Sequence, residues 1–266
     1  MDSFNNRTDN MAYNNAHRNS ALSERLAEYM DCPCRLIPQG TGINEVNQKY
    51  LSVLRYGMEH GSTPVLIPVK EPLINHLRGG QGFNINAVRQ QRRSSLWELN
   101  ADAGKSLLDA AYEEKSQFIA YKGVDLGDFE NGAHQGVAVN CFSSFLSGGR
   151  TNCEVLLAQV PTANPWEIFV WLPVGGLNGA PANNELAAVS KRWNELCGAL
   201  PAVVGYGVVE YFIPRGKPDP QIAKEIAKGQ FAICPERALC MTRSHTASEL
   251  ADTLTKSCVW YLGWRE

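Results

Sequence analysis

The end of the chain constrains the fold more than any other segment. Residues 253–266 read TLTKSCVWYLGWRE, and large apolar side chains crowd the last eight positions: Val259, Trp260, Tyr261, Leu262 and Trp264. Side chains alternate between the two faces of a strand, so Cys258, Trp260, Leu262 and Trp264 would share one face and Val259 and Tyr261 the other. Both faces are apolar up to Gly263, which is typical of a strand covered on both sides. The sequence therefore predicts a buried C-terminal strand.

Length and composition indicate a globular protein that needs no disulfide or metal to fold. The chain has 266 residues, 44% hydrophobic and 20% charged, with a formal net charge of -2. That charge argues against broad electrostatic binding of nucleic acid or anionic membrane. No run approaches the roughly 20 apolar residues of a membrane helix, and the first twenty residues lack the apolar region of a secretory signal. We expect a cytoplasmic protein whose scattered cysteines stay reduced.

The composition divides the chain into four ranges. Residues 1–20 are rich in Asn and predict a disordered tail. Residues 21–122 form an N-terminal α/β part, in which a strand at 34–40, a helix at 43–60 and a strand at 63–69 make a βαβ unit with parallel strands and a right-handed crossover. Residues 123–150, rich in Gly, Asp, Asn and Ser, predict a flexible junction. Residues 151–266 form a C-terminal domain.

The C-terminal domain alternates strand and helix patterns. Strands are predicted at 153–160 and 258–264, and 201–214 predicts two short strands or one bent strand with glycines at 205 and 207. Residues 166–174 start as helix or strand and end as strand. Helices are predicted at 183–197, with Asn183 or Asn184 as N-cap, at 218–229, and at 246–255 behind a Thr246–Glu249 capping box. The fold class is α/β (α+β), with a mixed central sheet flanked by helices.

An ordered series of motifs in this domain resembles the bacterial family catalogued as domain of unknown function 4253. The motifs are a P-x-x-x-P-W-E turn, a G-G-x-N loop with a following Pro, a helix bearing Trp, a C-P-[DE] motif and a terminal L-A-D-x-L…V-W-Y-x-x-W. Their residues here are Pro161, Pro165, Trp166, Glu167, Gly175, Gly176, Asn178, Pro181, Trp193, Cys234, Pro235, Glu236, Leu250, Ala251, Asp252, Leu254, Val259, Trp260, Tyr261 and Trp264. The segment at 31–35 and the strand at 63–69 also look like longer members, so the resemblance covers roughly residues 25–266.

The chain departs from the family pattern at a few positions. Leu177 stands where Trp is usual, Glu236 replaces the commoner Asp, and Gly263 and Arg265 replace the last Trp and Asp of a W-W-D ending. If that Asp carries an activity in relatives, this chain has lost it or Glu266 replaces it. The resemblance implies no known activity, so it leaves function open.

Several short patterns favour structural readings over cofactor sites. AGKS at 103–106 lacks the earlier glycine of a phosphate-binding loop, and GGQGFN at 79–84 lacks the strand and helix of a dinucleotide site. DLGDFENG at 125–132 lacks the alternating ligands of a calcium loop. The Arg89, Arg92 and Arg93 cluster is better explained as a solvated helix face than as a nucleic-acid contact. We expect no cofactor.

The spacing of the cysteines and histidines does not indicate a metal or redox site. Cys32-Pro33-Cys34 is C-x-C rather than C-x-x-C and precedes a strand, whereas a redox pair of the C-x-x-C kind has its thiols at the start of a helix. The five histidines are isolated, so a metal site would need ligands from remote segments, and we expect none. Cys34 or Cys141 could pair with His134 as nucleophile and base, but buried, inert thiols are the simpler reading.

The remaining candidate is a cleft in the C-terminal domain. It combines polar groups with aromatic walls: Asn178, Trp193, Glu210, Cys234, Glu236 and Trp264. A carboxylate on an apolar strand is costly if buried unpaired, so Glu210 either faces solvent or has partners. Two functions follow. One is a non-catalytic protein-interaction or immunity-type module. The other is a small-molecule hydrolase or transferase using acids or a cysteine, so the partner is either a protein or a small ligand.

Overall fold

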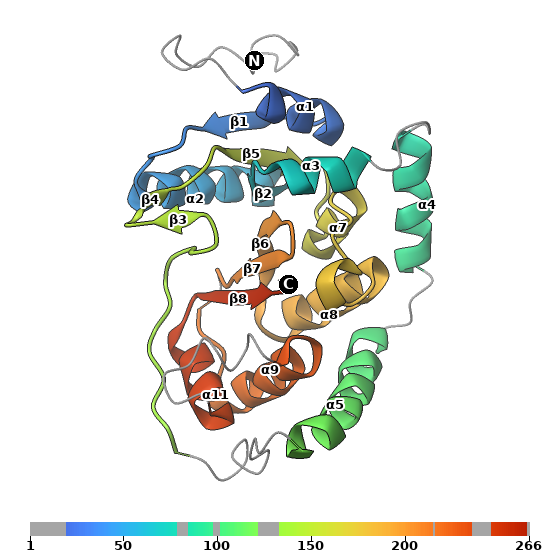
Figure 1. Ribbon diagram of the computed structural model, residues 1–266, viewed down its shortest axis with the longest axis vertical. Helices are drawn as coiled ribbons and strands as arrows, with labels where there is room; N and C mark the ends of the chain where they lie inside the picture. Colours follow the sequence, from blue (N-terminus) through green and yellow to red (C-terminus); the bar gives the residue numbers. More distant parts are fainter. Residues whose placement is uncertain are drawn as a thin grey trace. The chain divides into compact units, whose positions relative to one another are not determined.

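The computed structural model describes residues 20–78, 85–97, 102–121, 133–214, 216–235 and 246–264 (Figure 1). All but the last residue of the predicted 1–20 tail lies outside these ranges. The chain divides into two compact units, Met1–Gly80 with Phe145–Asn164, and Gln81–Ser144 with Pro165–Glu266. This division differs from the predicted boundaries because residues 145–164 return to pair with the N-terminal strands.

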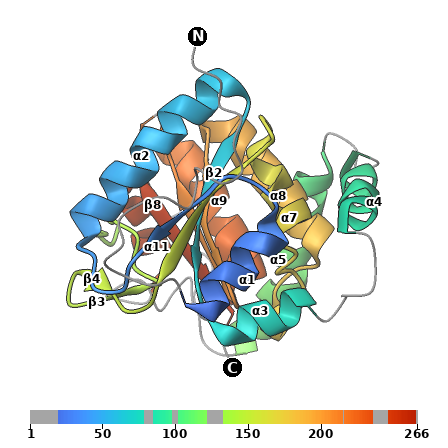
Figure 2. The same ribbon diagram turned by 90° about the horizontal axis from the view of Figure 1, so that it is seen from above.

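The first unit is built on a three-stranded antiparallel arrangement. β5 (Val155–Val160) lies between β1 (Cys34–Ile37) and β2 (Thr63–Pro68) and runs antiparallel to both (Figure 1, Figure 2). β1 and β2 are therefore parallel, as predicted, but they are not neighbours. The strands are accompanied by α1 (Ala21–Met30), α2 (Ile43–His60), α3 (Glu71–Arg78) and the small β3–β4 ribbon (Leu146–Ser147, Arg150–Thr151).

The second unit contains an antiparallel sheet in the order β6 (Leu200–Gly205), β7 (Val208–Phe212) and β8 (Val259–Gly263). Its helices are α4 (Ile85–Trp97), α5 (Ala103–Tyr121), α7 (Ile168–Trp171), α8 (Asn183–Cys197), α9 (Pro220–Ile233) and α11 (Ala247–Lys256), with short 3-10 turns at Pro165–Glu167 and Leu177–Gly179. The predicted α/β class is confirmed. Residues 201–214 form two strands joined by a turn at Tyr206 and Gly207.

Burial of the C-terminal strand is also confirmed. The side chains of Val259, Trp260 and Leu262 are at most 3% exposed, and Tyr261 is half-buried. Within the second unit β8 is last in the strand order and pairs with β7. Its burial therefore comes from the layers on its two faces rather than from strands on both edges.

Two local predictions are wrong. Residues 172–174 are not a strand. The segment before them folds as a 3-10 turn (Pro165–Glu167) followed by α7, and Leu172 donates its N–H to the Ile168 carbonyl. The N-cap of α8 is Ala182 rather than Asn183 or Asn184, because the Glu185 carboxylate accepts the Ala182 N–H at 2.7 Å. Asn183 instead donates from its side chain to the Phe169 carbonyl.

Candidate interaction site on the second unit

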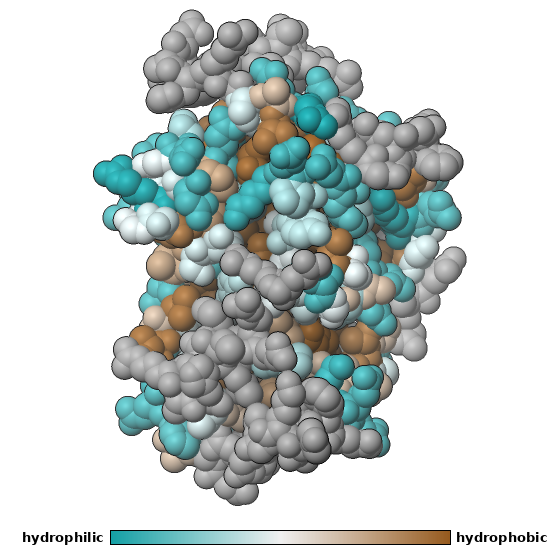
Figure 3. Space-filling view, in the orientation of Figure 1, coloured by the Kyte–Doolittle hydropathy of each residue, from teal (hydrophilic) through white to brown (hydrophobic). Residues whose placement is uncertain are grey.

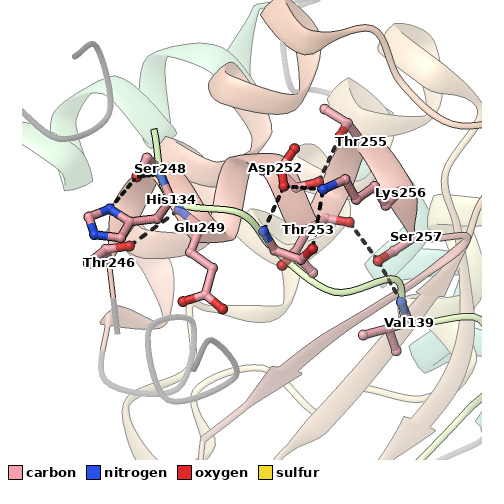
Figure 4. Close-up of polar contacts among 11 residues, drawn as sticks. His134, Val139, Thr246, Ser248, Glu249, Asp252, Thr253, Thr255, Lys256 and Ser257 are labelled. Atoms are coloured by element: carbon pink, nitrogen blue, oxygen red, sulfur yellow. Dashed lines mark hydrogen bonds and ion pairs between the residues drawn. The ribbon is translucent and has the colours of Figure 1, made fainter. Parts of the chain in front are cut away.

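An extended segment, residues 133–144, lies along α11, and we call it the strap (Figure 4). Three of its backbone N–H groups donate to α11 side chains or to the residue after the helix. His134 donates to Ser248 Oγ at 3.3 Å, Gly136 to Asp252 Oδ2 at 2.6 Å, and Val139 to Ser257 Oγ at 2.8 Å. Ser248 and Asp252 are four residues apart, so they share one face of the helix. α11 thus binds a main chain much as a receptor binds a peptide.

A charged pair reinforces this contact. The Lys256 ammonium pairs with the Asp252 carboxylate and also donates to the Gly136 carbonyl at 3.3 Å (Figure 4). Burial opposes ionisation of Asp252, but the hydrogen bonds from Lys256 and Gly136 and the Lys256 charge outweigh it and hold the pKa of Asp252 below its ordinary value. Asp252 is the acid of the L-A-D-x-L motif, so one family motif residue holds the strap in place.

Gly136 allows the strap to approach the helix closely. A Cβ at this position would lie 2.2 Å from Thr253 Oγ1, 2.4 Å from Thr253 N and 2.6 Å from the Glu249 carbonyl oxygen. Two of these atoms belong to the helix backbone and cannot rotate away. Any side chain at position 136 must therefore push the strap off α11.

We expect Gly136→Ala to release the strap locally. The displaced segment loses the hydrogen bonds to Asp252 and Lys256, and overpacking of this kind costs about 1–3 kcal/mol. Hydrogen exchange measured by mass spectrometry should show the Val139 amide exchanging at least about tenfold faster. Ala138→Val, which adds more bulk at an exposed position two residues away, is the matched control. Equal protection in both variants would contradict the close approach.

Glu210 fastens the other end of the strap. Its carboxylate accepts the N–H and hydroxyl of Ser143 at 2.8 and 2.9 Å, and the N–H and hydroxyl of Ser144 at 3.4 and 2.8 Å. Glu210 is fully buried. Of the two alternatives that the sequence left open, facing solvent or having partners, the structure shows the second. Burial raises the pKa of Glu210 above its ordinary value, and the four hydrogen bonds oppose that rise only in part.

Three predicted site residues meet at the end of β8. Asn178 Nδ2 donates to the Trp264 carbonyl at 3.3 Å, Cys234 Sγ donates to the Gly263 carbonyl at 3.2 Å, and Trp264 Nε1 donates to the Ile233 carbonyl at 2.8 Å. Gly207, at φ 64°, receives the strand end; a Cβ there would lie 2.2 Å from the Trp264 oxygen. The G-G-x-N and C-P motifs therefore secure the terminal strand.

Trp193 lies on α8. It is fully buried and packs edge-on against Tyr211 and Trp260, with ring centroids 5.1 and 6.3 Å away. The hydroxyl groups of Tyr211 and Ser190 of α8 are joined by a 2.8 Å hydrogen bond. These rings join α8 to the sheet.

The structure thus separates the predicted cleft residues. Side chains alternate along β7, so Glu210 lies on the face opposite Tyr211, Trp193 and Trp260. Asn178, Cys234 and Trp264 come together, and Glu236 lies outside the described residues. Ligand binding by this set stays a prediction.

The P-W-E motif and the arginine cluster form a second set of contacts. The guanidinium carbons of Arg89 and Arg93 lie 5.6 and 5.1 Å from the centre of the Trp171 ring, and Arg93 Nε pairs with the buried Glu167 carboxylate at 3.2 Å. Arg92 donates to the Val170 carbonyl at 3.1 Å. The solvated-face interpretation is wrong for Arg89, which is 7% exposed, because α4 turns its arginines onto α7.

The strap was the feature that sequence reasoning missed, because its anchors are single polar residues remote in sequence. His134, considered as a base for Cys34 or Cys141 and set aside in favour of inert thiols, places Nδ1 3.2 Å from Ser248 Oγ (Figure 4). Within the described ranges, no group of three or more His, Cys, Asp or Glu side chains is arranged to hold a metal ion. No helix among them is long and apolar enough to cross a membrane.

Comparison with known proteins identifies one family. Residues 156–265 match the model of the family described as Domain of unknown function (DUF4253). Neither curated proteins nor solved structures gave a match. The matched range includes α8, α9, α11 and β8. It also includes Asn178, Glu210 and Asp252, whose hydrogen bonds are described above. The resemblance seen in the sequence is confirmed over residues 156–265, which match the DUF4253 model.

Proposed function

We propose that the second unit is a non-catalytic protein-interaction module, of the general kind that includes immunity proteins, and that the strap is its recognition element. The observation that carries the proposal is the exposed outer edge of the strap. His134, Gly136 and Val139 turn their N–H groups to α11 and the residue after it. The residues between these anchors, Gln135, Val137 and Ala138, are exposed.

This edge has the properties of a strand-addition site. Gln135 and Val137 are exposed, and Val137, 44% exposed, is one of the few large hydrophobic side chains exposed in the described part of the chain. The others are Tyr56, Met58 and Tyr206, and hydrophobic residues on the face shown in Figure 3 are interspersed with hydrophilic ones. An extended partner segment could pair with the strap backbone and place an apolar side chain on Val137. We propose such a segment of another protein as the ligand.

The internal bonding of the predicted site residues supports a binding role over a catalytic one. The carboxylate of Glu210, the thiol of Cys234 and the indole N–H of Trp264 all engage protein groups. A group that acts as acid, base or nucleophile has to reach the substrate. These groups support the scaffold that presents the strap.

The test compares two lysine substitutions at exposed apolar positions. Full-length wild type, Val137→Lys and Met58→Lys are used to capture proteins from the native host. We expect one protein to bind wild type and Met58→Lys, where Met58 is 69% exposed, and at least about tenfold less to Val137→Lys. Equal binding to all three would overturn the strap as the recognition element, and no bound protein would overturn the interaction module.

A second candidate, a hydrolase or transferase, is favoured by one observation. Ser248 Oγ lies 3.2 Å from His134 Nδ1, which is within reach for a nucleophile and its base. Ser248 is also 7% exposed and accepts the His134 N–H, which suits an anchor better. Labelling of Ser248 by a fluorophosphonate probe, lost in His134→Ala, would favour this candidate.

A further inference from the structure

Two cysteines lie where the strap crosses the start of β8. The Cys258 N–H donates to the Val139 carbonyl and to Asn140 Oδ1, both at 3.2 Å, and the Val259 N–H donates to the same carbonyl at 3.1 Å. Cys141 is the next residue after Asn140. Cys141 is exposed and Cys258 is half-buried, and both are free thiols.

The strap is held on both sides of Cys141. Val139 is bonded to Ser257, Cys258 and Val259, and Ser143 is bonded to Glu210. The backbone around Cys141 is therefore held near Cys258. Such tethering gives the second thiol a high effective concentration.

The electrostatics agree with this proximity. Burial raises the pKa of the Cys258 thiol, and a thiolate at Cys141 raises it further, whereas the backbone N–H of Cys258 and the Lys217 ammonium lower it. The pKa of Cys258 therefore responds to charge at Cys141. Cys141, being exposed, is the thiol that an oxidant meets first.

We propose that Cys141 and Cys258 form a redox-active pair that closes a disulfide and fixes the strap to β8. The Cys141 thiol loses its proton and the thiolate attacks one oxygen of hydrogen peroxide. The O–O bond breaks, Cys141 becomes a sulfenic acid, and the hydroxide that leaves takes up the lost proton as water. The Cys258 thiol then attacks the sulfenic sulfur, the S–S bond forms, and water leaves with the thiol proton. The two thiols lose two electrons in total, peroxide is reduced to two waters, and a dithiol reductant reverses the change.

The disulfide between Cys141 and Cys258 would restrict the motion of the strap. A disulfide requires Cβ atoms about 3.5–4.5 Å apart, which draws position 141 against the start of β8. The hydrogen bonds of Val139 would then open less often, because their opening would need the whole linked segment to move. This inference goes beyond partner binding and stands without it.

The test uses the full chain treated with peroxide, alkylated and digested without reduction. We expect a linked peptide pair containing Cys141 and Cys258, absent from Cys141→Ser and from Cys258→Ser and retained in Cys153→Ser. Exchange of the Val139 amide should slow by about tenfold on oxidation and recover with dithiothreitol. Oxidation of Cys141 to sulfinic acid without the link, or linkage of Cys141 equally to other cysteines, would overturn the proposal.

Discussion

Trp260→Ala should lower the free energy of unfolding by about 3–5 kcal/mol, as large-to-small core substitutions do. The side chain is 2% exposed and packs edge-on against Trp193, so its loss leaves a cavity between α8 and the sheet. Denaturant titration measures the loss as a lower midpoint. A midpoint equal to that of wild type would contradict the buried strand.

Trp260→Phe is the control for this prediction. The Trp260 Nε1 atom is buried and has no hydrogen-bond partner among the described residues. Phe keeps most of the apolar contact and removes that unpaired donor, whose burial costs free energy. We therefore expect Phe to be clearly less destabilising than Ala.

Glu210→Ala should cost about 2–4 kcal/mol and detach the end of the strap. The substitution removes four hydrogen bonds from Ser143, which is exposed, and Ser144, which is half-buried. Each such bond contributes about 0.5–1.5 kcal/mol. The two N–H groups cannot turn away, whereas the hydroxyls can. Hydrogen exchange should show faster exchange at Ser143 and Ser144, while unchanged protection there would contradict the anchor.

The pH dependence separates the charge of Glu210 from its shape. Because the pKa of Glu210 is raised on folding, the folded state binds the proton more tightly than the unfolded state. Its contribution to stability is fully present below the unfolded pKa and is lost as pH rises through the folded pKa. Glu210→Gln should remove this part of the pH dependence, measured by denaturant titration across that window.

The elements that the sequence predicted well carry local signals. The alternation at 258–264 predicted a strand buried on both faces, and the pattern over residues 183–197 predicted α8. Both signals arise within a few residues, so a single sequence contains them. The parallel orientation of β1 and β2 was predicted for the same reason, from strand–helix–strand spacing.

What the sequence could not predict depends on partners far along the chain. β5 enters between β1 and β2, a pairing that no local pattern encodes. The strap falls within the range predicted as a flexible junction, because the Gly, Asp, Asn and Ser of residues 123–150 outweighed the one apolar segment inside it, VAVNCFSSFL. Its extended conformation is set by Ser248, Asp252 and Glu210, more than 60 residues away.

The placement of β5 bears on how the first unit can fold and on how the DUF4253 domain can be excised. β5 lies at the start of the matched range, 156–265, while β1 and β2 lie before it. Folding must therefore bring together strands separated by residues 81–144, and such non-local pairing is slow. A fragment cut at the family boundary would carry β5 without these two neighbours, and an apolar strand with open edges is a template for aggregation.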